Sequence, residues 1–112
     1  GLDAGGQAML MGLLTEISKN GTSIILATHD MDVVLKYADR AIVLDKGKVV
    51  SDSTPLDLFQ NSEFLNKSSL EPPKVFRFAL DLKKHGLDIN LNNIKDCDSL
   101  ADEIIRVKSG VK

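Results

Sequence analysis

Four apolar residues near the start of the chain recur at the spacing of a helix with one buried face. They are Leu10, Leu13, Leu14 and Ile17, which follow the i, i+3, i+4, i+7 pattern. The pattern predicts a helix over residues 6–19. The Asn-Gly pair that follows predicts where this helix ends, because glycine readily adopts the left-handed conformation found after helices.

The next apolar stretch does not alternate with polar residues. Residues 22–28 read Thr-Ser-Ile-Ile-Leu-Ala-Thr, which is typical of a strand covered on both faces of a parallel sheet. With the preceding helix, this strand would form part of a right-handed crossover unit. A second helix is predicted to begin after Asp30, whose carboxylate can accept hydrogen bonds from the first turn. The residues expected on its buried face are Met31, Val34, Leu35 and Ala38.

A hairpin is predicted further along the chain. Residues 41–44 form an apolar strand, residues 45–48 a tight turn with a glycine, and residues 49–51 a returning antiparallel strand. We therefore expect a parallel sheet that ends in a hairpin. Thr54 before Pro55 predicts the start of a short helix that reaches Gln60.

A change of character near residues 68–72 predicts a boundary between residues 1–67 and 68–112. Residues 61–73 are polar and rich in turn formers, and the Pro-Pro pair at their end disfavours helix just before it. Beyond it, one helix is expected to end at His85-Gly86, and another to start at Ser99. Their expected buried residues are Val75, Phe78, Ala79 and Leu82 in the first, and Leu100, Ile104 and Val107 in the second. Two short helices cannot bury a core alone, so they should pack on the preceding domain or on a partner.

Composition limits the classes of function. The chain has 112 residues, of which 43% are hydrophobic, so it can build one modest core. Its formal net charge of -2 gives no support for nucleic-acid binding. Its apolar runs are much shorter than the ~20 residues that span a bilayer, so a link to a membrane would come through a partner. The single Cys97 is expected to be a small, partly buried structural residue, and one free thiol fits a reducing cytosol.

His29 is the residue with the clearest chemical potential. A neutral imidazole can donate one hydrogen bond and accept another, and the carboxyl end of a strand is where α/β proteins bind ligands. This position suits a side chain that reads a phosphate, although a histidine after an apolar strand can also be a core residue. His85 is expected to cap a helix end, and the two histidines form no local metal cluster.

Three segments together resemble the last third of an ABC-transporter nucleotide-binding domain. They are residues 1–3 (Gly-Leu-Asp), residues 23–30 and residues 38–50. The resemblance implies a partial P-loop NTPase-like α/β sheet with a terminal hairpin, followed by a small helical extension. It also implies that His29 is the H-loop residue that contacts the γ-phosphate. Asp3 would belong to the D-loop, which couples the two sites across a dimer interface. Ala4 departs from the proline that is common there.

The residues that would cradle and hydrolyse a nucleotide are not found in this sequence. There is no G-x-x-x-x-G-K-[ST] loop and no Asp-Glu pair at a strand end that could hold Mg²⁺. We expect the chain to be a fragment that starts in the D-loop of a longer protein. The parent would use ATP and Mg²⁺, whereas the fragment alone would neither bind nor hydrolyse ATP.

The tail narrows the resemblance. Residues 70–75, 78–80 and 85–89 are similar to the C-terminal extension of ATPases from energy-coupling-factor transporters of the cobalt/nickel type. This implies a peripheral ATPase on the cytoplasmic face of the cell membrane that couples ATP binding and hydrolysis to the import of cobalt, a related metal ion or a vitamin. Its partners would be a second ATPase subunit, in a homodimer or heterodimer, a membrane scaffold subunit and a substrate-binding subunit.

Two other functions stay open from the sequence. The chain could be a non-catalytic module, with residues after Ser68 forming a dimerisation or regulatory surface. It could also be a stand-alone phosphate-binding enzyme that uses His29 as an acid or base. The sequence shows no second catalytic group at a useful spacing from His29.

Overall fold

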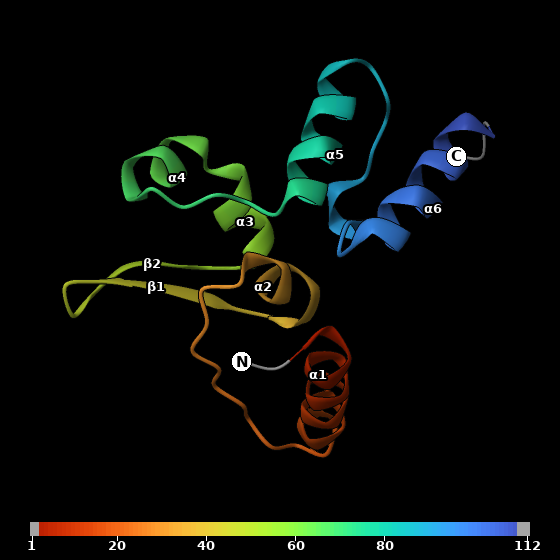
Figure 1. Cartoon of the computed structure of the whole chain (residues 1–112). Helices are drawn as coiled ribbons and strands as arrows, with labels where there is room; N and C mark the ends of the chain where they lie inside the picture. The colour runs from red at the N-terminus through yellow and green to blue at the C-terminus, as the bar shows by residue number, and fades with distance from the viewer. Residues whose placement is uncertain (1–2, 110–112) are drawn as a thin grey trace.

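The structure, a computed structural model, describes residues 3–109 and combines helices with one hairpin (Figure 1). Gly1 and Leu2 of the predicted D-loop therefore lie outside the described residues. In chain order the elements are α1 (Ala4–Lys19), α2 (Met31–Tyr37), β1 (Ala41–Asp45), β2 (Lys48–Ser53), α3 (Pro55–Gln60), α4 (Ser62–Ser68), α5 (Lys74–Lys84), the 3₁₀ turn η1 (Leu91–Asn93) and α6 (Cys97–Lys108). We use the term "extension" for residues 74–108, which contain α5, η1 and α6.

Side-chain caps start each of the first three helices. The Asp3 carboxylate accepts from the Gly6 amide at the start of α1. Asp30 accepts from the first turn of α2, and Thr54 accepts from the Asp57 amide at the start of α3, where Pro55 is the first helical residue. The predicted starts of α2 and α3 are confirmed, and α3 ends at Gln60 as expected.

The predicted hairpin is confirmed, but the parallel sheet is not. Strands β1 and β2 pair antiparallel from Ala41 opposite Ser53 to Asp45 opposite Lys48. The turn between them places Lys46 and Gly47 at positive φ (52° and 77°), a conformation that glycine adopts at little cost. Within residues 3–109, this pair is the whole sheet.

The prediction of a buried strand over residues 22–28 is wrong for this structure. The segment runs from α1 to α2 without regular secondary structure, and its side chains are exposed, with Ile25 98% accessible (Figure 1). A strand requires hydrogen-bonded neighbours, and among the described strands β1 and β2 pair only with each other. The apolar face predicted for α1 is also largely exposed, including Leu13 and Ile17, because the described sheet consists of the β1–β2 hairpin alone and does not cover it.

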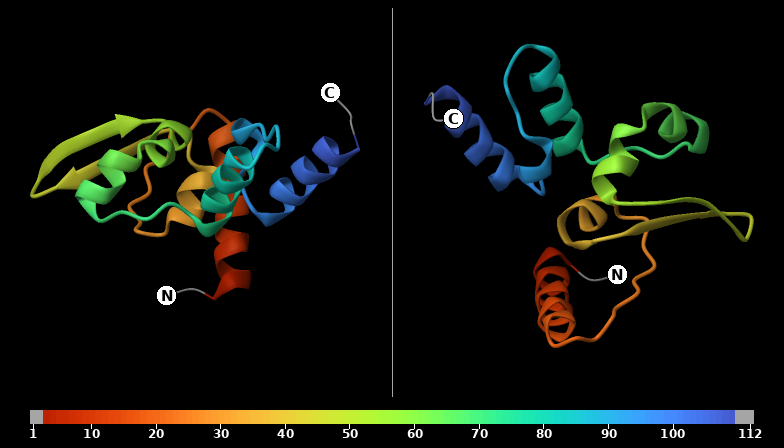
Figure 2. Two further views of the ribbon diagram at one scale, coloured as in Figure 1. Left: turned by 90° about the horizontal axis from the view of Figure 1, so that it is seen from above. Right: turned by 180° about the vertical axis from the view of Figure 1, so that it is seen from behind.

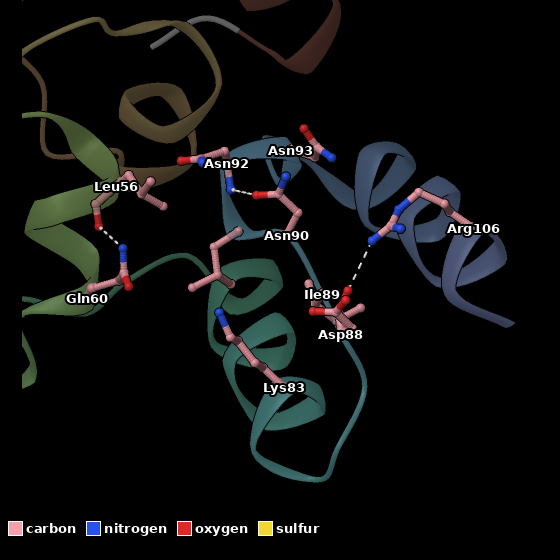
Figure 3. A pocket seen from close by; sticks show the side chains of 10 residues that line it. Leu56, Gln60, Lys83, Asp88, Ile89, Asn90, Asn92, Asn93 and Arg106 are labelled. Carbon is pink, nitrogen blue, oxygen red and sulfur yellow. Dashed lines mark hydrogen bonds between the residues drawn. The ribbon is translucent and has the colours of Figure 1, made fainter. Parts of the chain in front are cut away.

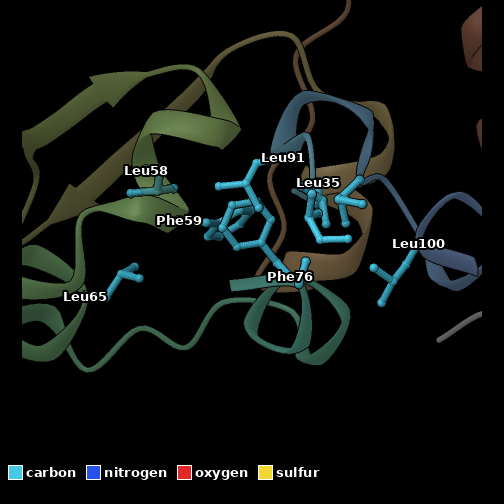
Figure 4. Close-up of a cluster of buried hydrophobic side chains, with 10 residues drawn as sticks. Leu35, Leu58, Phe59, Leu65, Phe76, Leu91 and Leu100 are labelled. Carbon is cyan, nitrogen blue, oxygen red and sulfur yellow. The ribbon is translucent and has the colours of Figure 1, made fainter. Parts of the chain in front are cut away.

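The hydrophobic core lies between α2, the two helices after the hairpin and the extension (Figure 4). Phe59 and Phe76 form a tilted aromatic pair with ring centroids 5.9 Å apart, and both are almost inaccessible to solvent. The extension therefore packs on the preceding elements, as expected for helices too short to form their own core. The buried members of this cluster are Leu35, Leu58, Phe59, Leu65, Phe76, Ala79, Ile89, Leu91, Ile94 and Leu100.

Helix α1 lies on one side of α2, and α5 lies on the opposite side (Figures 1 and 2). As a result, α2 is the helix through which the start of the described chain and the extension are connected. None of the described helices is long and apolar enough to cross a bilayer.

Several features after Gln60 differ from the sequence-based predictions. Helix α4 occupies part of the polar, turn-rich stretch 61–73, for which the sequence predicts no helix, and Asn61 caps it by accepting from the Phe64 amide. Phe76, rather than Phe78, enters the core, and Phe78 is 56% exposed. Helix α6 begins at Cys97 instead of Ser99, because Asp96 and Ser99 form a capping box.

Two smaller predictions about the extension have opposite outcomes. Cys97 is exposed at the first position of α6, not partly buried as expected. Helix α5 ends at Lys84 with His85 as its C-cap, as predicted, and the His85 ring Nδ1 donates to the Asp81 carbonyl oxygen at 2.8 Å. The residue that follows, Gly86, has φ of 104°, a conformation that favours glycine.

Candidate functional site

The segment around the predicted switch histidine is held by the hydrogen bonds of Asp30. One carboxylate oxygen, Oδ1, accepts from the amides of Asp32 at 3.0 Å and Val33 at 3.4 Å. The Asp30 amide donates to Thr28 Oγ1 at 3.0 Å. Residues 28–30, which we call the switch segment, thus form a short side-chain-supported turn that leads directly into α2.

His29 lies in the middle of the switch segment, between these two anchored neighbours. Its side chain is exposed, so its ring can reach a ligand outside the segment. A core role for this histidine is therefore wrong for the present structure. The structure combines a positioned backbone with an accessible imidazole, the arrangement needed to place one donor and one acceptor against a polar ligand.

Asp3, the other predicted site residue, lies at the start of α1. Its Oδ1 accepts from the Gly6 amide at 2.7 Å, and its carbonyl oxygen accepts from the Gln7 amide at 2.9 Å. The side chain of the same Gln7 donates through Nε2 to Asp30 Oδ2 at 3.3 Å. The structure therefore connects the starts of α1 and α2, which contain the two residues selected from the sequence, through one glutamine.

Sequence reasoning missed the part that Gln7 plays. The sequence pattern identifies Asp30 only as a helix cap, and nothing in it connects Asp30 with a residue 23 positions earlier. The only available signal was the place of Gln7 one turn after Asp3, on the helix face that follows the predicted D-loop.

Metal ligands do not gather in the part of the chain that the structure describes. No group of three or more His, Cys, Asp or Glu side chains is placed to hold an ion there. The donor set around His29 contains one imidazole and one carboxylate already engaged by three hydrogen bonds. These residues fit contact with a phosphate oxygen better than coordination of Mg²⁺, which prefers several oxygen ligands.

A separate polar cleft of about 630 Å³ lies between α3 and the extension (Figure 3). Its walls contain amide side chains together with cationic Lys83 and Arg106. Neither His29 nor Asp3 contributes to it. The lining residues are Leu56, Gln60, Lys83, Asp88, Ile89, Asn90, Leu91, Asn92, Asn93 and Arg106.

A buried carboxylate organises one wall of this cleft. Glu103 is 3% exposed and pairs with Arg106 through bonds of 2.9 Å from Nε and 2.7 Å from Nη2. It also accepts from the Asn90 amide at 2.6 Å and from the Asn93 side chain at 3.3 Å. The pKa of Glu103 is lowered to about 2. The main cause is the hydrogen bond from Arg106, and the next is the hydrogen bond from the Asn90 amide. The group therefore acts as a fixed anion that ties η1 to α6.

A second ion pair connects the extension to α2. Lys36 Nζ lies 3.3 Å from Asp96 Oδ2, with side chains 46% and 33% exposed. The hydrogen bond to Asp96 raises the pKa of Lys36. The pKa of Asp96 is lowered, first by the Ser99 amide that it caps and further by Lys36. The N-terminus of α6 and the last turn of α2 are thus joined by opposite charges.

Comparison with known proteins shows a consistent set of relatives, although no family model matches the chain. The chain is 41% identical over 98% of its length to the energy-coupling factor transporter ATP-binding protein EcfA2 of Mesoplasma florum. It is 36% identical over 96% of its length to the protein of the same name from Mycoplasma capricolum, and 38% identical over 98% to that from Ligilactobacillus salivarius. These matches cover 35%, 37% and 38% of the relatives, so the chain spans little more than a third of their length.

Proposed function

Because the chain belongs to the energy-coupling factor transporter ATP-binding proteins, as their C-terminal portion, we propose that it supplies the switch histidine of an ABC-type ATPase that drives transport. The observation that supports this most directly is the accessible His29 on an anchored backbone at the start of α2. The proposed role of His29 is to donate from its ring to a γ-phosphate oxygen of ATP and to hold the attacking water in line.

The chain's own residues divide this work between two helix starts. Asp30 and Thr28 fix the backbone on both sides of His29, so little conformational freedom is lost when the ring binds. Gln7 ties this segment to α1, the helix that Asp3 of the proposed D-loop caps. We propose that Asp3 couples the site to a second ATPase subunit across a dimer interface.

ATP and Mg²⁺ are the proposed cofactors of the longer protein. When bound, the nucleotide supplies the phosphoryl group and the ion neutralises its charge. Of the required contacts, these 112 residues offer the imidazole of His29, while a glycine-rich phosphate loop is not found in the sequence. The residues that hold the nucleotide and the ion are proposed to lie in the rest of the parent protein.

The exposed apolar surface supports such a longer parent. It includes Leu13 on α1, Ile25 before the switch segment, and Leu44 and Val49 on the hairpin, each at least 59% exposed. Exposed apolar area of this kind marks surfaces that are covered by other protein. We propose that the remaining two thirds of the parent covers it, and that residues 22–28 then become a buried strand of a parallel sheet. The division into residues 1–67 and 68–112 is part of this proposal.

We also propose a location, partner subunits and a solute for the transport role. The ATPase would act on the cytoplasmic face of the membrane, bound to a membrane scaffold subunit that works with a substrate-binding subunit. The proposed solute is cobalt, a related metal ion or a vitamin. A non-catalytic dimerisation or regulatory module is the second candidate. Its surface would lie after Ser68, where Phe78 and Ile105 are exposed apolar residues that could serve association between copies.

The test is His29→Ala in the full-length parent, with His85→Ala as the matched control. Both histidines are exposed, but His85 caps α5 and lies in the extension. We expect His29→Ala to lower ATP turnover by about 100-fold or more, with the ATP dissociation constant changed less than about threefold. His85→Ala should keep wild-type turnover. Wild-type turnover in His29→Ala would refute the proposed function.

A further inference from the structure

The extension is attached to the helix that carries the switch segment, at the opposite end of that helix. Helix α2 has seven residues and is therefore only about 10 Å long. Its N-terminus is capped by Asp30, the residue after His29. Its last turn contains Lys36, which pairs with Asp96 of the extension. A helix this short moves as one body, so a shift at one end is transmitted to the other.

Burial strengthens this attachment. Leu35, next to Lys36, is 1% exposed and belongs to the same core cluster as Phe76 of α5, Leu91 of η1 and Leu100 of α6 (Figure 4). Close packing of this kind fixes the orientation of α2 against the extension, because any rotation of the helix would open a cavity around Leu35.

The other partner of the ion pair is also held in place. Asp96 caps α6, and its Oδ1 accepts from the Ser99 amide at 2.9 Å. Its Oδ2 is the oxygen that faces Lys36. The two oxygens of one carboxylate therefore serve different elements, one fixing the start of α6 and the other the end of α2.

We propose that Lys36 and Asp96 are positioning residues through which the extension sets the placement of α2, and thereby of His29 in the switch segment. This inference rests on the proposed function of His29. It assigns the extension a role in the catalytic step itself, in addition to any role in association. Neither residue touches the reacting atoms, so their effect is expected on turnover and not on nucleotide affinity.

The experiment uses the full-length ATPase and a double-mutant cycle of Lys36→Met and Asp96→Asn. Methionine keeps an unbranched side chain without the charge, and asparagine remains a good helix cap. We expect each substitution to lower kcat about 2- to 5-fold, the size of effect that a partly exposed ion pair has, with KM for ATP nearly unchanged. The double variant should lose no more kcat than either single variant. Lys36→Arg keeps the positive charge and should retain wild-type kcat.

Two controls separate this inference from simpler explanations. Lys36 also lies 5.5 Å from the Tyr37 ring centroid, and Asp96→Asn removes the ion pair while leaving that contact intact. Lys67→Met changes an exposed lysine in the last turn of α4 and should leave kcat unchanged. The His29 ring resonances in a full-length sample labelled at histidine should shift in Lys36→Met and stay in place in Lys67→Met.

Turnover of His29→Ala and kcat of Lys36→Met together separate failure of the positioning role from failure of the proposed function. If His29→Ala abolishes turnover and Lys36→Met retains wild-type kcat, the proposed function stands and the positioning role is wrong. Additive losses in the double variant would also overturn the role, because the two residues would then act independently. If His29→Ala retains wild-type turnover, both proposals fall together.

Discussion

Gln7 and Asp30, 23 residues apart in the chain, are joined by a hydrogen bond of 3.3 Å from the glutamine Nε2 to the aspartate Oδ2. Gln7 lies in the first turns of α1, and Asp30 caps α2 immediately after His29. This contact matters because the segment between the two helices, which contains residues 22–28, has no regular secondary structure of its own. The switch segment is thus positioned by the Gln7 side chain of α1 and by the backbone amides at the start of α2.

Gln7→Glu tests the contribution of this contact. The substitution keeps the shape of the side chain, removes the donor, and places a carboxylate beside the Asp30 carboxylate at pH 7. We expect the free energy of unfolding of the 112-residue chain to fall by about 1–2 kcal/mol, measured by urea denaturation.

Gln60→Glu is the matched control for Gln7→Glu. Gln60 is exposed on α3, and its side chain donates to the Leu56 carbonyl within the same helix. Its replacement should change stability by less than about 0.5 kcal/mol. Equal losses in the two variants would show that the contact between α1 and α2 has no special contribution.

Phe76 and Phe78 offer a test of which face of α5 is buried. Phe76 is fully buried against Phe59, whereas Phe78 is 56% exposed. We expect Phe76→Ala to cost about 3–5 kcal/mol of folding free energy and Phe78→Ala less than about 1 kcal/mol. Phe76→Leu, with an expected loss of about 1–2 kcal/mol, keeps the comparison measurable if the alanine variant does not fold. A larger loss at Phe78 than at Phe76 would show that the other face of α5 is buried.

The local features were predictable because they depend on neighbours in sequence. The cap at Asp30, the Thr54-Pro55 start of α3 and the turn at Lys46-Gly47 follow from side-chain and backbone chemistry within a few residues. The burial pattern of α5 was harder to predict, because Phe76 and Phe78 are equally apolar and which of them is buried depends on tertiary neighbours, among them Phe59 of α3.

The largest error concerns residues 22–28 and has a physical cause. Their composition favours a buried strand, but a strand forms only with partners, which lie at other positions in the chain. The candidate site was predictable only in part, because some of its contacts also depend on residues far away in the sequence. His29 and the cap at Asp30 could be read from the sequence, while the bridge from Gln7 and the ion pair between Lys36 and Asp96 depend on tertiary contacts.

Glu103 gives a prediction about pH. Its pKa in the folded chain is about 2, below the ordinary value of 4.5, so the folded state binds this proton less readily than the unfolded state does. The resulting stabilisation is fully present above about pH 4.5 and is lost as the pH falls towards 2. We expect Glu103→Gln to lower the free energy of unfolding by about 2–3 kcal/mol at pH 7, measured by urea denaturation.

The matched control for Glu103 is Glu63→Gln, which alters an exposed residue in the first turn of α4. The stability difference between wild type and Glu103→Gln should shrink as the pH falls from about 4.5 towards 2, whereas Glu63→Gln should show little change at any pH. A constant difference across this range would mean that the stabilisation does not depend on the charge of Glu103.

Substitution of exposed apolar residues can distinguish the two candidate functions, because each function predicts association through a different surface. Ile25 is 98% exposed and Leu44 is 66% exposed, and both lie before residue 68, whereas Ile105 of α6 is 65% exposed in the extension. If the parent protein covers the surface that contains Ile25 and Leu44, the isolated chain should associate through that surface. We expect Ile25→Ser with Leu44→Ser to reduce the self-association measured by sedimentation velocity, and Ile105→Ser to leave it unchanged. Loss of association in Ile105→Ser alone would instead favour a dimerisation surface in the extension, and with it the non-catalytic module.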